Sequence, residues 1–233
     1  MPVIDLHSHI LSRADHGSES TEMSVSQLAL MKEMGTDIAV ATPHFYPNEH
    51  TIEDFCRRVD RAISKLHEAS PKSMPKLCLG AEVLYCKNMA HMSGIERLCI
   101  KGTKVMLVEM PFEALGNCHI EAVEELIDAG FTVVLAHIDR YLKHSASVID
   151  EMLELGAYAQ INAEAFANFG KRRRVMHYVK ETDRVVALGS DLHGNSQKNY
   201  KKFARLRAIL GDSFDTIMKR SASLLENAEY VEI

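Results

Sequence analysis

The chain has 233 residues, of which 46% are hydrophobic and 25% are charged, as is ordinary for a packed soluble protein. Its 27 Lys and Arg residues against 32 Asp and Glu residues give a net charge of −5, which argues against a general nucleic-acid binder. No apolar run reaches the ~20 residues that a membrane span needs, so we expect no membrane insertion. The five cysteines lack C-x-x-C spacing and indicate reduced thiols, so we expect a cytoplasmic protein.

Short apolar runs alternate with longer amphipathic segments along the whole chain. Seven strands are expected, near Val3–Leu6, Asp37–Ala41, Leu77–Leu84, Val105–Val108, Thr132–Ala136, Tyr158–Ile161 and Val185–Leu188. Helices are expected at Thr21–Met34, Ile52–Ala69, His119–Ala129 and Ser147–Leu155. No linker divides the chain, so residues 1–233 are predicted to form a single domain. The alternation indicates an α/β fold with a parallel sheet, and the lack of a glycine-rich nucleotide-binding motif favours a barrel.

Histidines and acidic residues stand where these apolar runs end. His7 and His9 are two residues apart, so both side chains point to the same side of the first strand. The later runs end in, or contain, His44, Glu82, Glu109, His137, and the pair Asp191 and His193. In parallel α/β barrels the carboxyl ends of the strands meet at one mouth, where active sites lie.

The combination of residue types at these strand ends predicts a metal centre. A buried carboxylate is costly unless it is paired or coordinated, and no Arg or Lys lies in the runs that carry Glu82 and Glu109. Imidazole and carboxylate ligands together suit Mn²⁺, Fe²⁺ or Zn²⁺. No cysteine is followed six positions later by Arg, which disfavours a cysteine-based phosphatase. The P-loop, G-x-S-x-G and H-E-x-x-H motifs are absent as well.

The order of the motifs resembles the polymerase and histidinol phosphatase (PHP) superfamily of metal-dependent phosphoesterases. More narrowly, it is similar to the bacterial protein tyrosine phosphatases encoded with capsule and exopolysaccharide genes. The matching segments are Ile4–Leu11, Ala41–His44, Gly80–Glu82, Val108–Pro111, Ala136–Arg140 and Gly189–His193. The resemblance implies a distorted seven-stranded β/α barrel of the PHP type, similar to a TIM barrel, which agrees with the seven apolar runs.

The resemblance also implies three divalent metal ions at the barrel mouth, most often Mn²⁺, with Fe or Zn as alternatives. The motif positions assign as ligands His7, His9, His16, His44, Glu82, Glu109, His137, Asp191 and His193. His16 stands in a loop where the close family reads Asp-Asp-Gly and this chain reads Asp15-His16-Gly17. We favour His16 because it directly precedes the glycine, and Asp15 is the alternative.

Two basic residues are implied to bind the substrate. Arg140 resembles a phosphate-binding Arg of the capsule phosphatases, which grips two phosphoryl oxygens at once. Lys198 stands near the position of a second family Arg, and it supplies charge without the planar fork of a guanidinium. We expect Arg140, His44 and Asp191 to take part in catalysis, in which a hydroxide bridging two ions attacks phosphorus without a covalent enzyme intermediate.

The family implies phosphotyrosine as the substrate, on the tail of a tyrosine kinase that controls capsular or exopolysaccharide synthesis. Two alternatives stay open at this point. One is a small-molecule phosphatase, such as one acting on histidinol phosphate. The other is a non-catalytic metal-binding module that docks a kinase. The sequence also leaves open the metal used in the cell, the general acid and the oligomeric state.

Overall fold

A computed structural model describes residues 1–69, 71–194 and 197–233, and for residues 197–199 it describes the backbone only. The strands are β1 (Ile4–Ser8), β2 (Ile38–Ala41), β3 (His44–Phe45), β4 (Lys76–Leu79), β5 (Glu82–Leu84), β6 (Val105–Glu109), β7 (Thr132–Leu135), β8 (Tyr158–Asn162) and β9 (Val185–Gly189). The α-helices are α1 (Thr21–Glu33), α2 (Ile52–Ala69), α3 (Asn117–Asp128), α4 (Ala146–Leu155), α5 (Ala163–Ala167), α6 (Phe169–Glu181), α7 (Gln197–Ala204), α8 (Leu206–Leu210) and α9 (Asp212–Leu224). The 3₁₀ helices are η1 (Met89–His91), η2 (Ile95–Leu98) and η3 (Ile138–Arg140).

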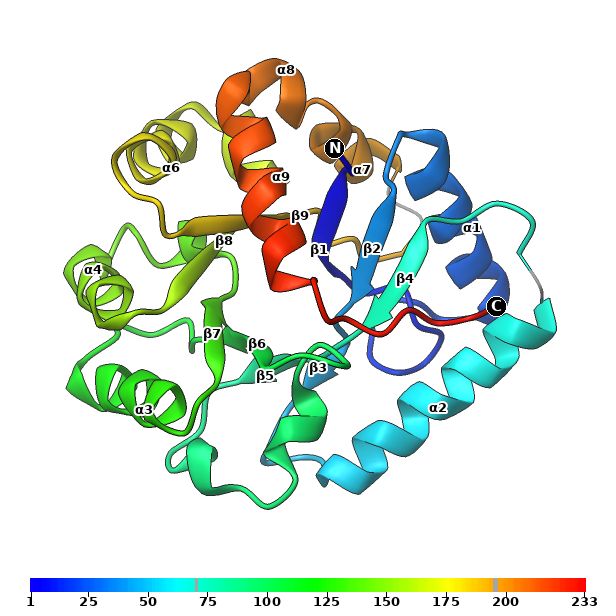
Figure 1. Ribbon diagram of the computed structural model, residues 1–233, viewed down its shortest axis with the longest axis horizontal. Coiled ribbons are helices and arrows are strands. Elements are labelled where there is room, and N and C mark those ends of the chain that lie inside the picture. The colour runs from blue at the N-terminus through cyan, green and yellow to red at the C-terminus, as the bar shows by residue number, and fades with distance from the viewer. Residues whose placement is uncertain (70, 195–196) are drawn as a thin grey trace.

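The strands form two parallel sheets that join into the predicted barrel. Their orders are β1-β2-β4 and β3-β5-β6-β7-β8-β9. The segment after β9 is hydrogen-bonded to β1 and to the residues that follow it, which closes the ring on this side. The His9 amide donates to the Leu192 carbonyl at 3.1 Å, and the Asp191 amide donates to the His7 carbonyl at 2.9 Å. Helices surround this ring of strands (Figure 1). The α/β barrel expected from the sequence is therefore confirmed.

One expected strand is wrong in its extent. The run Leu77–Leu84 is not one strand but two, β4 and β5, separated at Gly80 and Ala81. A break also separates β2 from β3 at Thr42 and Pro43, where proline has no amide hydrogen to donate to a ladder. The breaks have a common effect: β2 pairs with β4, whereas β3 pairs with β5 and sets His44 directly beside Glu82 in register.

The four helices expected from the hydrophobic pattern correspond to α1, α2, α3 and α4. Helix α2 matches its expected range, and the Asp54 amide donates to Thr51 Oγ1 at 3.1 Å, as in a capped N-terminus. Its buried face packs into a hydrophobic core that runs through the barrel. The basic run of residues 171–174 was expected to open a helical stretch and lies in α6, whereas α5, α8 and α9 were not among the helices expected from the sequence. In the described part of the chain, no helix has the length and apolar character needed to cross a membrane.

The C-terminal tail covers one end of the barrel. It crosses in front of the strands in Figure 1, where the Glu229 amide donates to the Lys101 carbonyl and the Val231 amide to the Leu77 carbonyl. Lys101 precedes β6, and Tyr230 forms an isolated antiparallel bridge with Cys78 of β4, so the tail runs along β4 beside the amino end of β6. The opposite end, where the strands have their carboxyl ends, is left for the side chains predicted to bind metal.

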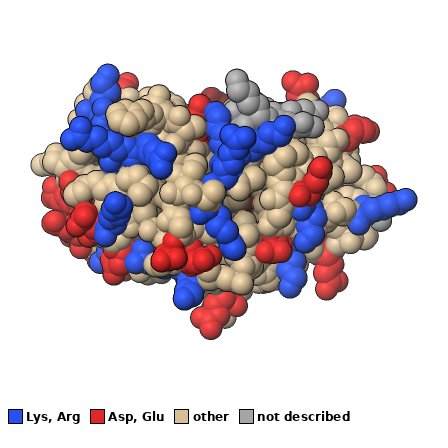
Figure 2. Space-filling view, turned by 90° about the horizontal axis from the view of Figure 1, so that it is seen from above, with Lys and Arg blue, Asp and Glu red and all other residues tan. Residues whose placement is uncertain are grey.

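The surface charge is unevenly spread despite the net charge of −5. Figure 2 views the side on which α8 lies in Figure 1, and Lys and Arg side chains gather there in its upper left part and near its centre. Helix α6 on this side begins with the basic run of residues 171–174, of which Arg172, Arg173 and Arg174 are exposed. The five cysteines are free thiols, as predicted.

Candidate metal centre

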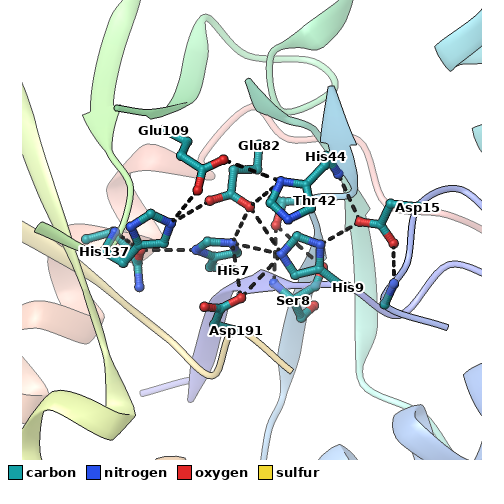
Figure 3. Close-up of polar contacts among 12 residues, drawn as sticks. His7, Ser8, His9, Asp15, Thr42, His44, Glu82, Glu109, His137 and Asp191 are labelled. Atoms are coloured by element: carbon teal, nitrogen blue, oxygen red, sulfur yellow. Dashed lines mark hydrogen bonds and ion pairs between the residues drawn. The ribbon is translucent and has the colours of Figure 1, made fainter. Parts of the chain in front are cut away.

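The structure brings most of the predicted site residues together at the carboxyl ends of the strands (Figure 3). They come from β1, β3, β5 and β6 and from the first residues after β1, β7 and β9. The fully or nearly fully buried members are His7, His9, His44, Glu82, Glu109 and His137. Buried charged side chains are costly unless they have close partners of opposite charge or hydrogen-bond partners. Here the histidines and the carboxylates are each other's partners.

Glu82 lies at the centre of the cluster. Its Oε2 lies 3.0 Å from His44 Nδ1, 3.1 Å from His7 Nε2 and 3.2 Å from His9 Nε2. Its Oε1 lies 2.7 Å from His137 Nε2. Burial would raise the pKa of Glu82, but the charge of His7 and hydrogen bonds with the neighbouring histidines hold that pKa well below its ordinary value. Glu82 therefore stays ionised, and one carboxylate contacts four imidazoles.

Two further carboxylates, those of Glu109 and Asp191, flank the cluster of histidines around Glu82. Glu109 lies with Oε2 3.6 Å from His44 Nδ1 and Oε1 3.5 Å from His137 Nε2. Asp191 Oδ1 lies 3.4 Å from His9 Nε2 and 3.3 Å from His193 Nδ1. The imidazoles thus lie between the carboxylates of Glu109 and Asp191. The nitrogen-to-oxygen distances to these two carboxylates are within ion-pair range but longer than those of good hydrogen bonds.

The donor atoms fit divalent cations. Three groups of side chains each place their ligand atoms within 4.8 Å of one another, namely His9, His44 and His193; His7, His9 and Glu82; and His44, Glu82 and Glu109. Each group shares one residue with each of the others. Three buried atoms in these groups, Glu82 Oε2, His44 Nδ1 and His193 Nε2, make no hydrogen bond of good geometry despite their close neighbours. Orphaned acceptors that converge on one place are what a bound cation satisfies.

His44 is held in the form that binds a metal. Burial, together with the positive charges of His9 and His7, lowers the pKa of His44 to about 3, against the opposing effect of Glu82 and Asp15. The imidazole is therefore neutral, and an unprotonated ring nitrogen is the form in which histidine coordinates a metal.

Two of the predicted ligands have an unusual backbone. His137 (φ 32°) and Asp191 (φ 51°) both lie in the left-handed region directly after β7 and β9. Such a conformation costs about 1–3 kcal/mol outside glycine and persists only where the surroundings impose it. Both side chains are turned in this way toward the centre of the barrel mouth (Figure 3).

The loop after β1 separates the roles of Asp15 and His16. Asp15 Oδ2 accepts hydrogen bonds from His9 Nδ1 at 2.6 Å and from the His44 amide at 2.9 Å, so Asp15 orients two histidines. The His16 ring lies nearly parallel to that of His44, with centroids 4.9 Å apart, and 4.8 Å from that of His193. A Cβ at Gly17 would lie 2.1 Å from His9 Cβ, so only glycine allows the loop to approach this closely.

Sequence reasoning missed two site residues on β8, the strand to which it assigned no ligand. Gln160 Oε1 accepts from the His137 amide at 2.6 Å and lies 3.1 Å from His7 Nδ1. Gln160 Nε2 donates to Asn162 Oδ1, and Asn162 Nδ2 donates to Asp191 Oδ2, both at 2.8 Å. The visible signal was the alternation of two amides in an otherwise apolar run, because buried amides need partners.

Gln160 is positioned to fix the tautomer of His7. When His7 Nδ1–H donates to Gln160 Oε1, His7 Nε2 is directed toward Glu82 and His9, and it is the nitrogen that a metal would bind once it is deprotonated. Gly189 makes this contact sterically feasible, since a Cβ there would lie 2.5 Å from Gln160 Nε2 and 2.6 Å from His7 Cβ.

Replacing Gln160 by leucine is expected to weaken the binding of divalent ions by about 10–100-fold, the usual effect of losing a residue that orients metal ligands. The buried His137 amide also loses its acceptor, which costs about 1–3 kcal/mol of unfolding free energy. Gln160→Glu keeps an acceptor oxygen and is expected to retain more of the affinity. Calorimetric metal titration measures the effect, and Ser221→Ala removes a buried hydrogen bond to the Val186 carbonyl as the matched control. Equal losses in both variants would contradict the orienting role.

Arg140 spans the open side of the cluster. Its Nη2 donates to Asp191 Oδ2 at 2.5 Å, and its Nη1 lies 3.2 Å from His137 Nε2 and 3.7 Å from Glu109 Oε1. Arg140, His16 and His193 line a cavity of about 400 Å³ next to the cluster. Lys198, the second predicted substrate-binding residue, belongs to α7, but its side chain lies outside the described part of the structure.

Comparison with known proteins gives a consistent relationship. The chain is 28% identical over 206 residues to the tyrosine-protein phosphatase CpsB of Streptococcus agalactiae serotype V, covering 82% of this chain and 83% of that protein. It is 24% identical over 233 residues to the tyrosine-protein phosphatase YwqE of Bacillus subtilis, covering 96% and 91%.

Solved structures share the fold. One chain from the crystal structures of YwqE from Bacillus subtilis and CpsB from Streptococcus pneumoniae, described as metal-dependent tyrosine phosphatases, superposes with a TM-score of 0.81 at 21% identity, over 99% of this chain and all of that one. A TatD-like protein of Archaeoglobus fulgidus has a TM-score of 0.53 at 13% identity, over 96% and 99%. A family model described as "Capsular polysaccharide synthesis, CpsB/CapC" matches residues 3–230. The chain therefore belongs to the CpsB/CapC family of capsular polysaccharide synthesis proteins.

Proposed function

We propose that the protein is a metal-dependent tyrosine phosphatase that acts in capsular or exopolysaccharide synthesis. The observation that carries the proposal is the buried cluster of histidines around Glu82, capped by Arg140, in a chain of the CpsB/CapC family. Cations and an arginine at one barrel mouth are the groups that stabilise a phosphoryl dianion during transfer. Its substrate is a phosphotyrosine protein, namely the tail of a bacterial tyrosine kinase.

The ligand set proposed from the sequence remains our proposal for this site. Three divalent ions, with Mn²⁺ as the expected metal, are held by His7, His9, His16, His44, Glu82, Glu109, His137, Asp191 and His193. When bound, such ions activate water and neutralise phosphoryl charge. Asp15, Gln160 and Asn162 orient these ligands without joining them. The stacking of His16 on His44 and the engagement of Asp15 by His9 support His16 as the loop ligand.

Arg140 carries the proposed substrate binding. Its guanidinium donates to Asp191 and faces the cavity, so it exchanges a carboxylate partner for phosphoryl oxygens when substrate enters. The nearby Glu109 and Asp191 keep its charge compensated in the free enzyme. Arg140 thus orients the phosphoryl group at the cavity.

The purified protein, stripped with a chelator and then reloaded with Mn²⁺, tests the function. We expect hydrolysis of a phosphotyrosine peptide that disappears on chelation, returns with Mn²⁺ and exceeds that of histidinol phosphate. The melting temperature is expected to rise on reloading, because ions that bind only the folded chain stabilise it. Addition of Mg²⁺ to the reloaded protein at the same ionic strength serves as the control. Turnover of neither substrate after loading would overturn the proposal, whereas turnover of histidinol phosphate alone would replace it with a small-molecule phosphatase.

A further inference from the structure

The cavity beside the metal centre is lined by two kinds of side chain. The polar ones are candidate metal ligands together with Arg140. The others are Tyr46, Leu84, Pro111 and Phe112. The roles proposed so far use only the polar residues. Apolar and aromatic side chains beside a charged centre are how binding sites select the organic part of a charged ligand.

Phe112 stands out among the apolar and aromatic lining residues. It is 72% exposed, which is uncommon for a phenylalanine, and it lies only three residues after the end of β6, which carries Glu109. The Arg140 guanidinium carbon lies 5.5 Å from the centroid of the Phe112 ring, a distance typical of a cation–π contact. The side chain proposed to grip the phosphoryl group and an uncovered aromatic ring are therefore neighbours.

We propose that Phe112 is the specificity-determining residue that packs against the aromatic ring of the substrate, so that the site prefers aryl over alkyl phosphate esters. In an aryl ester the ring is joined to phosphorus through a single oxygen. A phosphoryl group beside Arg140 therefore brings its ring next to Phe112. An alkyl ester offers no flat face for an offset or edge-to-face contact. This inference rests on the proposed phosphatase function.

A purely supporting role for Phe112 predicts a different result. If its ring only held Arg140 in place, removing the ring would weaken the binding of every phosphoryl compound equally. If it packs against the substrate ring, removing it weakens only aryl compounds. A pair of ligands that share the same head group and differ in the organic part separates the two roles.

The experiment measures dissociation constants of phenylphosphonate and methylphosphonate by calorimetry with the Mn²⁺-loaded full chain. In Phe112→Ala we expect the affinity for phenylphosphonate to fall by about two- to tenfold, the range of one aromatic pair, with methylphosphonate unchanged. Phe112→Trp is expected to keep the preference for the phenyl compound. The KM for a phosphotyrosine peptide rises in Phe112→Ala with little change in kcat. Phe169→Ala, at an 89% exposed phenylalanine that does not line this cavity, is the matched control.

Each alternative outcome has a definite meaning. Equal weakening of both phosphonates would overturn the inference in favour of a supporting role, and no weakening of either would overturn it outright. In both cases hydrolysis of the phosphotyrosine peptide by the wild-type protein would leave the proposed function standing. Failure of the wild-type protein to hydrolyse that peptide would remove the function and the inference together.

Discussion

Glu82→Gln is expected to remove bound divalent ions and to lower kcat/KM on a phosphotyrosine peptide by about a thousandfold or more. Glu82 Oε2 contacts three histidines and belongs to two of the three candidate ligand groups, so its charge supports more of the site than that of Glu109 or Asp191 does. A thousandfold loss corresponds to about 4 kcal/mol of transition-state stabilisation, within what metal activation provides. Elemental analysis of the purified variant and steady-state kinetics measure the two effects.

Glu82→Gln conserves size, so the barrel is expected to remain folded and its circular dichroism to match that of the wild type. Glu151→Gln, at an exposed glutamate of α4, makes the same chemical change away from the site. A Glu82→Gln protein that retained both its ions and its activity would show that the metal centre lies elsewhere.

Arg140→Ala is expected to lower kcat/KM by about a hundred- to a thousandfold, the usual range for a lost donor to a developing negative charge. Unlike the change at Glu82, it is expected to leave the metal content intact, because Arg140 approaches Asp191, His137 and Glu109 from the open side of the cluster and Glu82 is not among its contacts. Arg140→Lys restores the charge but not the paired donors, so a partial recovery is expected.

If Arg140 binds the substrate, Arg140→Ala lowers kcat/KM without lowering the metal content. Arg57→Ala, at an exposed arginine of α2 that pairs with Asp54, controls for the loss of a positive charge. Loss of metal together with activity in Arg140→Ala would instead assign Arg140 to the support of the metal ligands.

The barrel and the location of the site were predictable because they follow from strong local rules. The two-residue period of a strand placed His7 and His9 on one side, and both are buried with ring centroids 5.1 Å apart. The rule that the carboxyl ends of parallel barrel strands lie at one mouth then predicted that residues as distant in sequence as His7 and Asp191 lie close together. His7 Nε2 lies 3.8 Å from Asp191 Oδ1.

The sequence did not predict which strands pair with each other or which residues contact one another across strands. The run Leu77–Leu84 is apolar apart from Gly80 and Glu82, and its pattern did not reveal the change from β2 to β3 as neighbour. The contacts of Gln160 run to His7, on the other side of one intervening strand, and no local rule connects the two. Periodicity reports that a residue is buried, but it does not report which residue faces it.

The shared membership of the three ligand groups has a consequence for how the centre fills. His9, His44 and Glu82 each belong to two groups, whereas His7, His193 and Glu109 each belong to one. Glu82 has two carboxylate oxygens and can serve two ions, whereas His9 directs one ring nitrogen into the cluster and can serve only one. An ion in one group therefore changes the ligands available to the other groups, so a metal titration curve is expected to depart from that of independent sites. Only changes at His7, His193 or Glu109 affect one group directly. Ions that bind here are therefore expected to be coupled, so that the affinity of each depends on which of the others is present.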